Sequence, residues 1–206
     1  MSKKETIIFD FDGTIADSLP IIYKTSNDIL RGENRKKLSP EDIERMKEGG
    51  IKNALKELNV SIFKFPFLIL KIQLEVYNRI DEVDAFSGMI PVLRDLNDDF
   101  KLGILTNNRK KTVYKFLNQN KLDFFDFVDD NLLLREKSKK LKKLSTEGSG
   151  IYVGDQVADM RAAKKANLLA IGVTWGVDEK VDLHRAGADM IVDSPGKIYG
   201  YIDNLN

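Results

Sequence analysis

The segment formed by residues 6–14, TIIFDFDGT, constrains the fold more than any other stretch of the sequence. Its apolar half is rich in isoleucine and phenylalanine and ends in a turn signal, which predicts a buried β-strand. Asp10 would lie at the carboxyl end of that strand and Asp12 in the loop after it, where open α/β sheets bind their ligands. Two carboxylates this close repel each other, so each needs a cation, a proton or a hydrogen-bond donor. An Asp-Gly pair is most often only a turn, so the rest of the chain must decide.

The composition is that of a globular protein with a sizeable core. The chain has 206 residues, of which 42% are hydrophobic, and this share is ordinary for a folded domain. Its 33 basic and 32 acidic residues give a formal net charge of +1, so we expect no nucleic-acid-binding surface. The chain contains no cysteine, which excludes thiol catalysis, thiolate metal sites and disulfides.

The sequence predicts no targeting or membrane-spanning segment. Residues 1–4 lead directly into the first expected strand, which leaves no room for a secretory signal. The most apolar later run, residues 65–70, is far shorter than the ~20 residues that a membrane span needs. We therefore expect a soluble, cytoplasmic protein with no membrane partner. The sequence carries no indication of its oligomeric state.

Strand and helix patterns alternate along most of the chain. Short apolar runs predict further strands at residues 102–106, 151–155, 169–173 and 190–192, with a weaker one at 124–128, and helical patterns occur at 91–97, 110–120, 139–144 and 158–166. This alternation is typical of a parallel sheet covered by helices on both faces.

Residues 17–83 break this alternation because they contain only helical patterns. They include a helix that opens at Ser39 and that we expect Gly49 and Gly50 to interrupt. The sequence thus predicts an α/β protein in two parts. A Rossmann-like parallel-sheet core would comprise residues 1–15 and 86–206, and an all-helical cap, residues 16–85, would be inserted after the first strand.

Three of the expected strands end in polar residues. Asp10 and Asp12 follow the first strand, Thr106 ends the second, and Asp155 ends the strand that precedes Asp159. Because the carboxyl ends of parallel strands meet at one edge of a sheet, four carboxylates and a hydroxyl would gather there. Such a cluster needs a cation, and Mg²⁺ suits oxygen ligands best. The lack of cysteine and the single histidine, His184, argue against zinc.

A carboxylate nucleophile beside Mg²⁺ suits phosphoryl transfer, in which positioning and charge neutralisation supply most of the catalysis. A lysine is then needed near the transferred group, and residues 135–140, REKSKK, offer several. Runs of lysine are usually solvated helix faces, so at most one of these is expected to be catalytic.

Taken together, these segments resemble the four motifs of the haloacid dehalogenase superfamily. The matching segments are residues 10–14 (DFDGT), Thr106-Asn107, a lysine before a helix, and Gly154-Asp155 with Asp159. The resemblance is closest to the phosphoglycolate phosphatase-like branch, in which a helical cap follows the first motif. It covers the core, whereas the cap matches only in length and helicity.

The resemblance implies a Mg²⁺-dependent phosphatase that acts on a small phosphorylated metabolite. Asp10 would attack phosphorus and form an aspartyl-phosphate. Asp12 would protonate the leaving oxygen and then activate the hydrolytic water. Thr106, Asn107 and the lysine would bind the phosphoryl oxygens.

For the metal, the resemblance implies Asp10, Asp155 and the backbone carbonyl of Asp12 as ligands, with Asp159 supporting the ion or its waters. The family's usual Lys-Pro pair is absent. Lys137, which precedes an expected helix, is the first candidate for the catalytic lysine, and Lys139 is the second.

Three alternative functions can be compared with this one, and the presence of Asp12 argues against the first of them. A dehalogenase of the superfamily would lack the second acid, Asp12, and would bind no magnesium. A sugar-phosphate mutase uses the same residues and differs mainly in its cap. A non-catalytic phospho-acceptor or binding module, such as a receiver domain, shares the acidic pocket, but it needs only roughly 120 residues and has no helical insertion.

Overall fold

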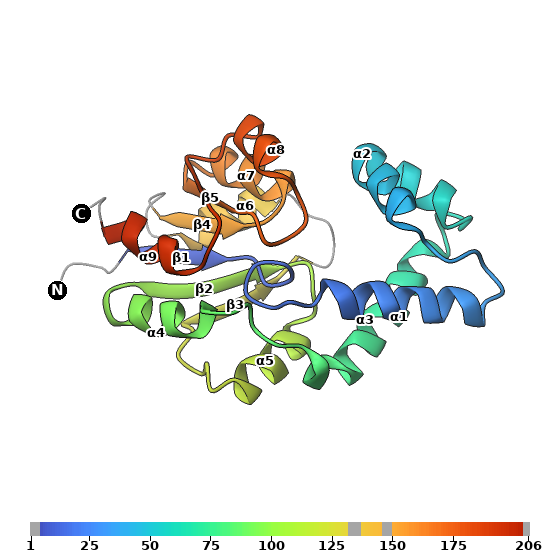
Figure 1. The fold of residues 1–206 in the computed structure, drawn as a ribbon, viewed down its shortest axis with the longest axis horizontal. Coiled ribbons are helices and arrows are strands. Elements are labelled where there is room, and N and C mark those ends of the chain that lie inside the picture. The colour runs from blue at the N-terminus through green and yellow to red at the C-terminus, as the bar shows by residue number, and fades with distance from the viewer. Residues whose placement is uncertain (1–4, 132–136, 146–149, 204–206) are drawn as a thin grey trace. The chain divides into compact units, whose positions relative to one another are not determined.

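The computed structural model describes residues 5–131, 137–145 and 150–203 (Figure 1). Its centre is a six-stranded sheet in the order β3-β2-β1-β4-β5-β6. All five strand pairings are parallel. The strands are β1 (Thr6–Phe9), β2 (Lys101–Thr106), β3 (Phe127–Asp130), β4 (Ile151–Gly154), β5 (Leu169–Val173) and β6 (Met190–Val192). The predicted α/β fold with a parallel-sheet core is confirmed.

Helices cover both faces of this sheet. They are α4 (Met89–Asp99), α5 (Lys110–Gln119), α6 (Lys137–Leu144), α7 (Val157–Lys165), α8 (Lys180–Arg185) and α9 (Gly196–Asp203). Figure 1 shows α4 and α5 on one face and α6 and α7 on the other. β1 is buried on both faces and therefore reads as a continuous apolar run. Ile8 and Tyr152 point to the same face and pack with Leu141 of α6 and Met160 of α7.

The chain divides into two compact units, one formed by Met1–Leu19 with Asp81–Asn206 and the other by Pro20–Ile80. We call these the sheet unit and the helical unit. The second contains most of α1 (Leu19–Gly32), with α2 (Pro40–Glu57) and α3 (Phe65–Asn78). A 3-10 turn, η1 (Ile80–Glu82), follows α3. Leu30, Leu58, Val60 and Leu68 lie in a core cluster of the helical unit.

The helical unit corrects one expectation from the sequence. Gly49 and Gly50 do not interrupt a helix, because α2 runs unbroken from Pro40 to Glu57. Its start is fixed by a capping box, in which Ser39 and Asp42 each bond the backbone of the other. A glycine inside a helix costs only about 1 kcal/mol relative to alanine. The cap and the burial of Ala54 and Leu58 offset that cost.

The two segments that join the units are paired with each other. Ala16 and Ala85 form an isolated antiparallel bridge. The Asp17 amide donates to the Asp84 carbonyl at 2.9 Å, and the Phe86 amide donates to the Ile15 carbonyl at 3.0 Å. The outgoing and returning chains therefore lie side by side where they leave the sheet unit.

Smaller differences concern the ends of elements. β3 begins at Phe127, three residues later than the sequence suggested, and Phe124 and Phe125 stack on each other in the turn before it. The short helices α8 and α9 were not foreseen. No helix in the described residues is both long and apolar enough to cross a membrane.

Candidate active site

The three central strands place the polar residues at one edge of the sheet. β1 lies between β2 and β4, with Phe9 opposite both Ile104 and Val153. Asp10 follows β1 directly, and its amide donates to the Val153 carbonyl at 2.8 Å. Thr106 is the last residue of β2, and Asp155 follows β4. The shared parallel direction therefore brings side chains that are about 50 and 100 residues apart to neighbouring strand ends.

Three carboxylates converge at this edge. Asp10, Asp155 and Asp159 each offer an oxygen atom within 4.8 Å of the others. Their residues are only 4%, 0% and 2% exposed. Burial raises the pKa of Asp10 well above its ordinary value, and nearby carboxylates raise it further against the opposing effect of Lys137. Burial, together with the charge of Asp159, raises the pKa of Asp155 to about 7. The cluster is thus poorly neutralised by the protein alone.

The donor set of this cluster fits a hard divalent cation. Carboxylate oxygens are the ligands that Mg²⁺ and Ca²⁺ prefer. Asp155 is fixed by two donors, the Thr14 hydroxyl at 3.0 Å and the Val177 amide at 2.9 Å. The sequence analysis expected Asp159 to support the metal and not to bind it directly. Its carboxylate is one of the three converging groups.

Glycines leave the room that these carboxylates occupy. A Cβ atom on Gly13 or Gly176 would collide with the Asp155 side chain, and one on Gly154 would collide with Asp159. Gly13 also has a φ of +77°, which disfavours any other residue. Trp175 secures the loop before Gly176 by donating from its indole Nε1 to the Thr14 carbonyl at 3.1 Å.

Lys137 is the cation that enters the cluster. Its Nζ lies 2.9 Å from Asp10 Oδ2 and 2.6 Å from Asp159 Oδ1, and its side chain is 10% exposed. Burial lowers the pKa of Lys137, but Asp10 and Asp159 outweigh this effect and the net shift is upward. The ammonium group therefore stays charged. Lys139, the second candidate in the sequence, is exposed.

Tyr152 of β4 supports this ion pair, a role that no motif in the sequence indicated. The Lys137 Nζ lies 5.2 Å from the centre of the Tyr152 ring. The Tyr152 hydroxyl lies 3.4 Å from Asp159 Oδ1 and 3.3 Å from the Leu105 carbonyl. Burial raises the pKa of the phenol well above its ordinary value, so it remains a neutral donor.

The Asp12 side chain is held separately from the other three acids. Its Oδ1 accepts a hydrogen bond from the Ser18 hydroxyl at 2.6 Å. Asn108 Nδ2 lies 3.3 and 3.1 Å from the two Asp12 oxygens. Burial raises the pKa of Asp12, although these two donors lower it in part. A carboxyl group with a raised pKa at a fixed position suits general acid–base catalysis.

Asn108 is a site residue that the sequence did not identify. The motif match drew attention to Asn107, whose side chain is exposed and accepts from Asn131 Nδ2 at 3.3 Å. Asn108 is buried, and its backbone N–H donates to the Thr106 hydroxyl oxygen at 2.9 Å. Its position two residues after the end of β2 was the only hint in the sequence, and the contact with Asp12 is seen only in the structure.

The pH dependence of stability in metal-free protein should report on this cluster. Folding raises the pKa of Asp155 from 3.8 to about 7, so the folded state binds more protons between these values. The contribution of Asp155 to the free energy of unfolding is therefore greatest below pH ~4. It falls by roughly 4 kcal/mol as the pH rises through 7. Thermal unfolding in EDTA from pH 4 to pH 8 measures the fall. The variant Asp155→Asn should flatten it, and equal slopes for both proteins would contradict the assignment.

Comparisons with known proteins cover almost the whole chain. Residues 7–173 match the family model described as haloacid dehalogenase-like hydrolase. The phosphoglycolate phosphatase of Synechococcus elongatus is 26% identical over 208 residues, covering 98% of each chain. The pyrophosphatase PpaX of Bacillus cereus is 23% identical over 98% of this chain and 97% of that protein. The fold resembles that of a predicted phosphatase from Clostridium acetobutylicum, with a TM-score of 0.83, 24% identity and coverage of 98% and 100%.

Proposed function

Because this chain belongs to the haloacid dehalogenase-like hydrolase family, we propose that it is a Mg²⁺-dependent phosphatase that hydrolyses a small phosphate monoester. The observation that carries the proposal is the convergence of Asp10, Asp155 and Asp159 beside the Lys137 ammonium group. A fourth acid, Asp12, is held apart from them by its own donors. The helical unit is then the cap that selects the substrate.

Each residue has a separate task in the proposed reaction. The Asp10 carboxylate attacks phosphorus, and an oxygen–phosphorus bond forms as the ester bond breaks. Asp12 gives its proton to the leaving alkoxide. It then takes a proton from the water that attacks the aspartyl-phosphate, which releases inorganic phosphate and restores Asp10. Lys137 and the Thr106 hydroxyl hold the phosphoryl oxygens, and Asn107 is a further candidate for this role.

Asp10, Asp155 and Asp159 would hold Mg²⁺, together with the backbone carbonyl of Asp12. The ion would supply positive charge to offset the charge of the phosphoryl group during transfer. Asp10 needs such an offset, because burial favours its neutral and non-nucleophilic form.

Hydrolysis of p-nitrophenyl phosphate tests the proposed activity and its metal. We expect phosphate release with MgCl₂, a loss of at least about 100-fold after EDTA treatment, and recovery when MgCl₂ is restored. Ca²⁺ at the same concentration is the matched control, because it shares oxygen ligands but prefers a larger, less regular site. Activity that EDTA leaves unchanged would contradict the proposed metal.

The substrate is proposed at the level of class. The relatives act, by their names, on phosphoglycolate or pyrophosphate, so these two compounds and sugar phosphates form the first panel to test. Accumulation of a phosphorylated product instead of free phosphate would indicate a mutase.

The variant Asn108→Ala tests the role of Asp12 as the acid. Loss of both donor contacts should let the carboxyl group rotate away from the leaving oxygen. We expect kcat for an alkyl phosphate to fall about 10–100-fold, since general acid catalysis contributes roughly 10²–10⁴-fold. The fall should be smaller for p-nitrophenyl phosphate, whose leaving group needs little protonation. Equal losses for the two substrates would contradict this role.

A further inference from the structure

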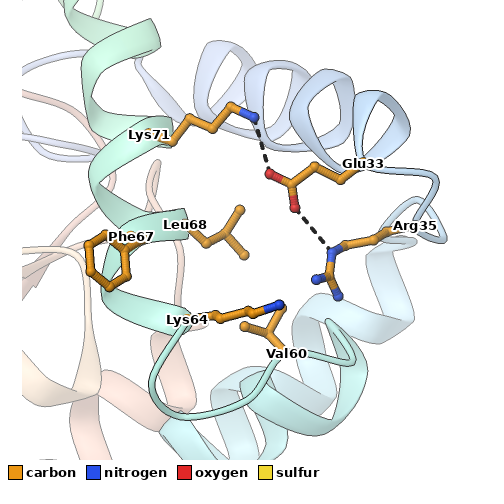
Figure 2. Close-up of a pocket in the computed structure, with 7 residues that line it drawn as sticks. All are labelled: Glu33, Arg35, Val60, Lys64, Phe67, Leu68 and Lys71. Atoms are coloured by element: carbon orange, nitrogen blue, oxygen red, sulfur yellow. Dashed lines mark hydrogen bonds and ion pairs between the residues drawn. The ribbon is translucent and has the colours of Figure 1, made fainter.

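A second candidate binding site lies within the helical unit. It is a cavity of about 360 Å³, and its lining residues, which Figure 2 draws, all belong to that unit. The volume falls within the range of ~300–1,000 Å³ that is usual for small-molecule sites. We call it the helical-unit pocket. It is lined by Glu33, Arg35, Val60, Lys64, Phe67, Leu68 and Lys71.

Helical spacing makes one wall of this pocket. Lys64, Phe67, Leu68 and Lys71 are separated by three, four and seven positions from the first of them, so they share one face at the start of α3. Leu68 is 6% exposed and Val60 is 7% exposed, and both belong to the core of the helical unit. The pocket therefore has a firm apolar floor with two lysines on the same wall.

The polar lining is unevenly charged, with three cations and one anion. Glu33 engages two of the cations, with its Oε1 3.1 Å from Lys71 Nζ and its Oε2 3.2 Å from Arg35 Nε. Arg35 also donates from Nη1 to the carbonyl of Leu58 at 3.1 Å and that of Asn59 at 2.6 Å. Arg35 is thus held in place by backbone carbonyls. Its ion pair with Glu33 can therefore persist when Lys71 binds another anion.

Lys64 is the cation of the lining that Glu33 does not pair with. No described residue forms an ion pair with its ammonium group, and its backbone forms the N-cap of α3 without a side-chain bond. Figure 2 shows its side chain extending across the pocket beside Val60 and toward the side of Arg35. An anion between Lys64 and Lys71 would meet two ammonium groups next to apolar surface, one of them shared with Glu33.

We propose that the helical-unit pocket binds a small organic anion that carries an apolar group. Its carboxylate, sulfonate or phosphate would bind Lys64 and Lys71, and its hydrocarbon part would lie on Val60, Leu68 and Phe67. Glu33 would disfavour highly charged polyanions. None of the residues that line this pocket belongs to the cluster of Asp10, Asp155 and Asp159.

Binding of 1-anilinonaphthalene-8-sulfonate tests the proposal, because this probe joins one sulfonate to an aromatic body. Fluorescence titration of the full-length protein in EDTA should show saturable binding of one probe per chain. The double variant Lys64→Gln, Lys71→Gln should weaken the binding at least about tenfold, a loss equivalent to 1.4 kcal/mol. Asp10→Asn should bind the probe as the unchanged protein does.

Two variants serve as matched controls, and we expect each to change the affinity less than about twofold. Lys52→Gln removes the same charge from an exposed position on α2. Phe63→Ser removes an aromatic side chain that is 84% exposed and lies outside the pocket lining. Its retention of binding would show that the probe does not simply coat exposed apolar surface.

Backbone amide NMR of the unchanged protein with the same probe gives a readout that needs no variant. The largest shift changes should fall on Val60, Phe67, Leu68 and their neighbours. The proposal is overturned by an absence of saturable binding, by equal loss in either control variant, or by shift changes confined to the strand ends of the sheet unit.

Discussion

Replacement of Asp10 by asparagine should reduce kcat for p-nitrophenyl phosphate by at least about 10³-fold, because no other group can take the phosphoryl group in its place. The amide keeps the size of the carboxyl group and removes a charge that burial already disfavours. The fold should therefore survive, with an unchanged circular dichroism spectrum and a melting temperature in EDTA that does not fall.

Asp130→Asn provides the control for this substitution. Asp130 ends β3, so it also lies at the carboxyl end of a strand, but it is not one of the three converging carboxylates. The activity of the Asp130→Asn variant should stay within about twofold of that of the unchanged protein, as is usual for a partly exposed position without a special role. If Asp10→Asn kept a tenth or more of the activity, the aspartyl-phosphate would be excluded, and a binding role for the acidic pocket would gain support.

Substitution of Lys137 by methionine should impair both activity and stability. Methionine preserves much of the volume but leaves Asp10 and Asp159 without the cation that lies 2.9 and 2.6 Å from them. Breaking a buried ion pair by removing one partner costs about 3–5 kcal/mol. We expect that loss in urea unfolding at pH 8 with EDTA, and a fall of about 10²-fold or more in kcat/KM.

The loss of stability in Lys137→Met should depend on pH in a predictable direction. Without Lys137 the pKa of Asp10 should rise further in the folded state, because the charge that partly lowered it is gone. The stability deficit should therefore be full at high pH and shrink as the pH falls and Asp10 becomes protonated. A deficit that grows toward low pH would contradict the argument.

Lys139→Met decides between the two lysines that the sequence offered. Lys139 is exposed, two residues further along α6, so its loss should change stability by less than about 0.5 kcal/mol. If Lys139→Met lost the activity and Lys137→Met did not, the assignment of the catalytic lysine would be reversed.

Local physics explains why much of the fold could be predicted from the sequence. β5 and β6 were placed at their observed ends, because short apolar runs bounded by polar residues have few other solutions in a parallel sheet. The helix starting near Ser39 was predicted from its cap. The continuity of α2 through Gly49 and Gly50 was not, because helix propensity is weak compared with the packing of the whole helix.

The sequence by itself determined which chemical groups this protein can bring together. Acids and a hydroxyl lie where strands end, lysines lie at the start of a helix, and the parallel direction of the strands brings the strand ends to one edge of the sheet. Only the tertiary structure decided which of these groups contact one another. It paired Lys137 with Asp10 and Asp159, brought Asn108 to Asp12, and gathered the lining of the helical-unit pocket. Such choices depend on side-chain directions and burial across segments far apart in the chain, and local residue patterns do not encode them.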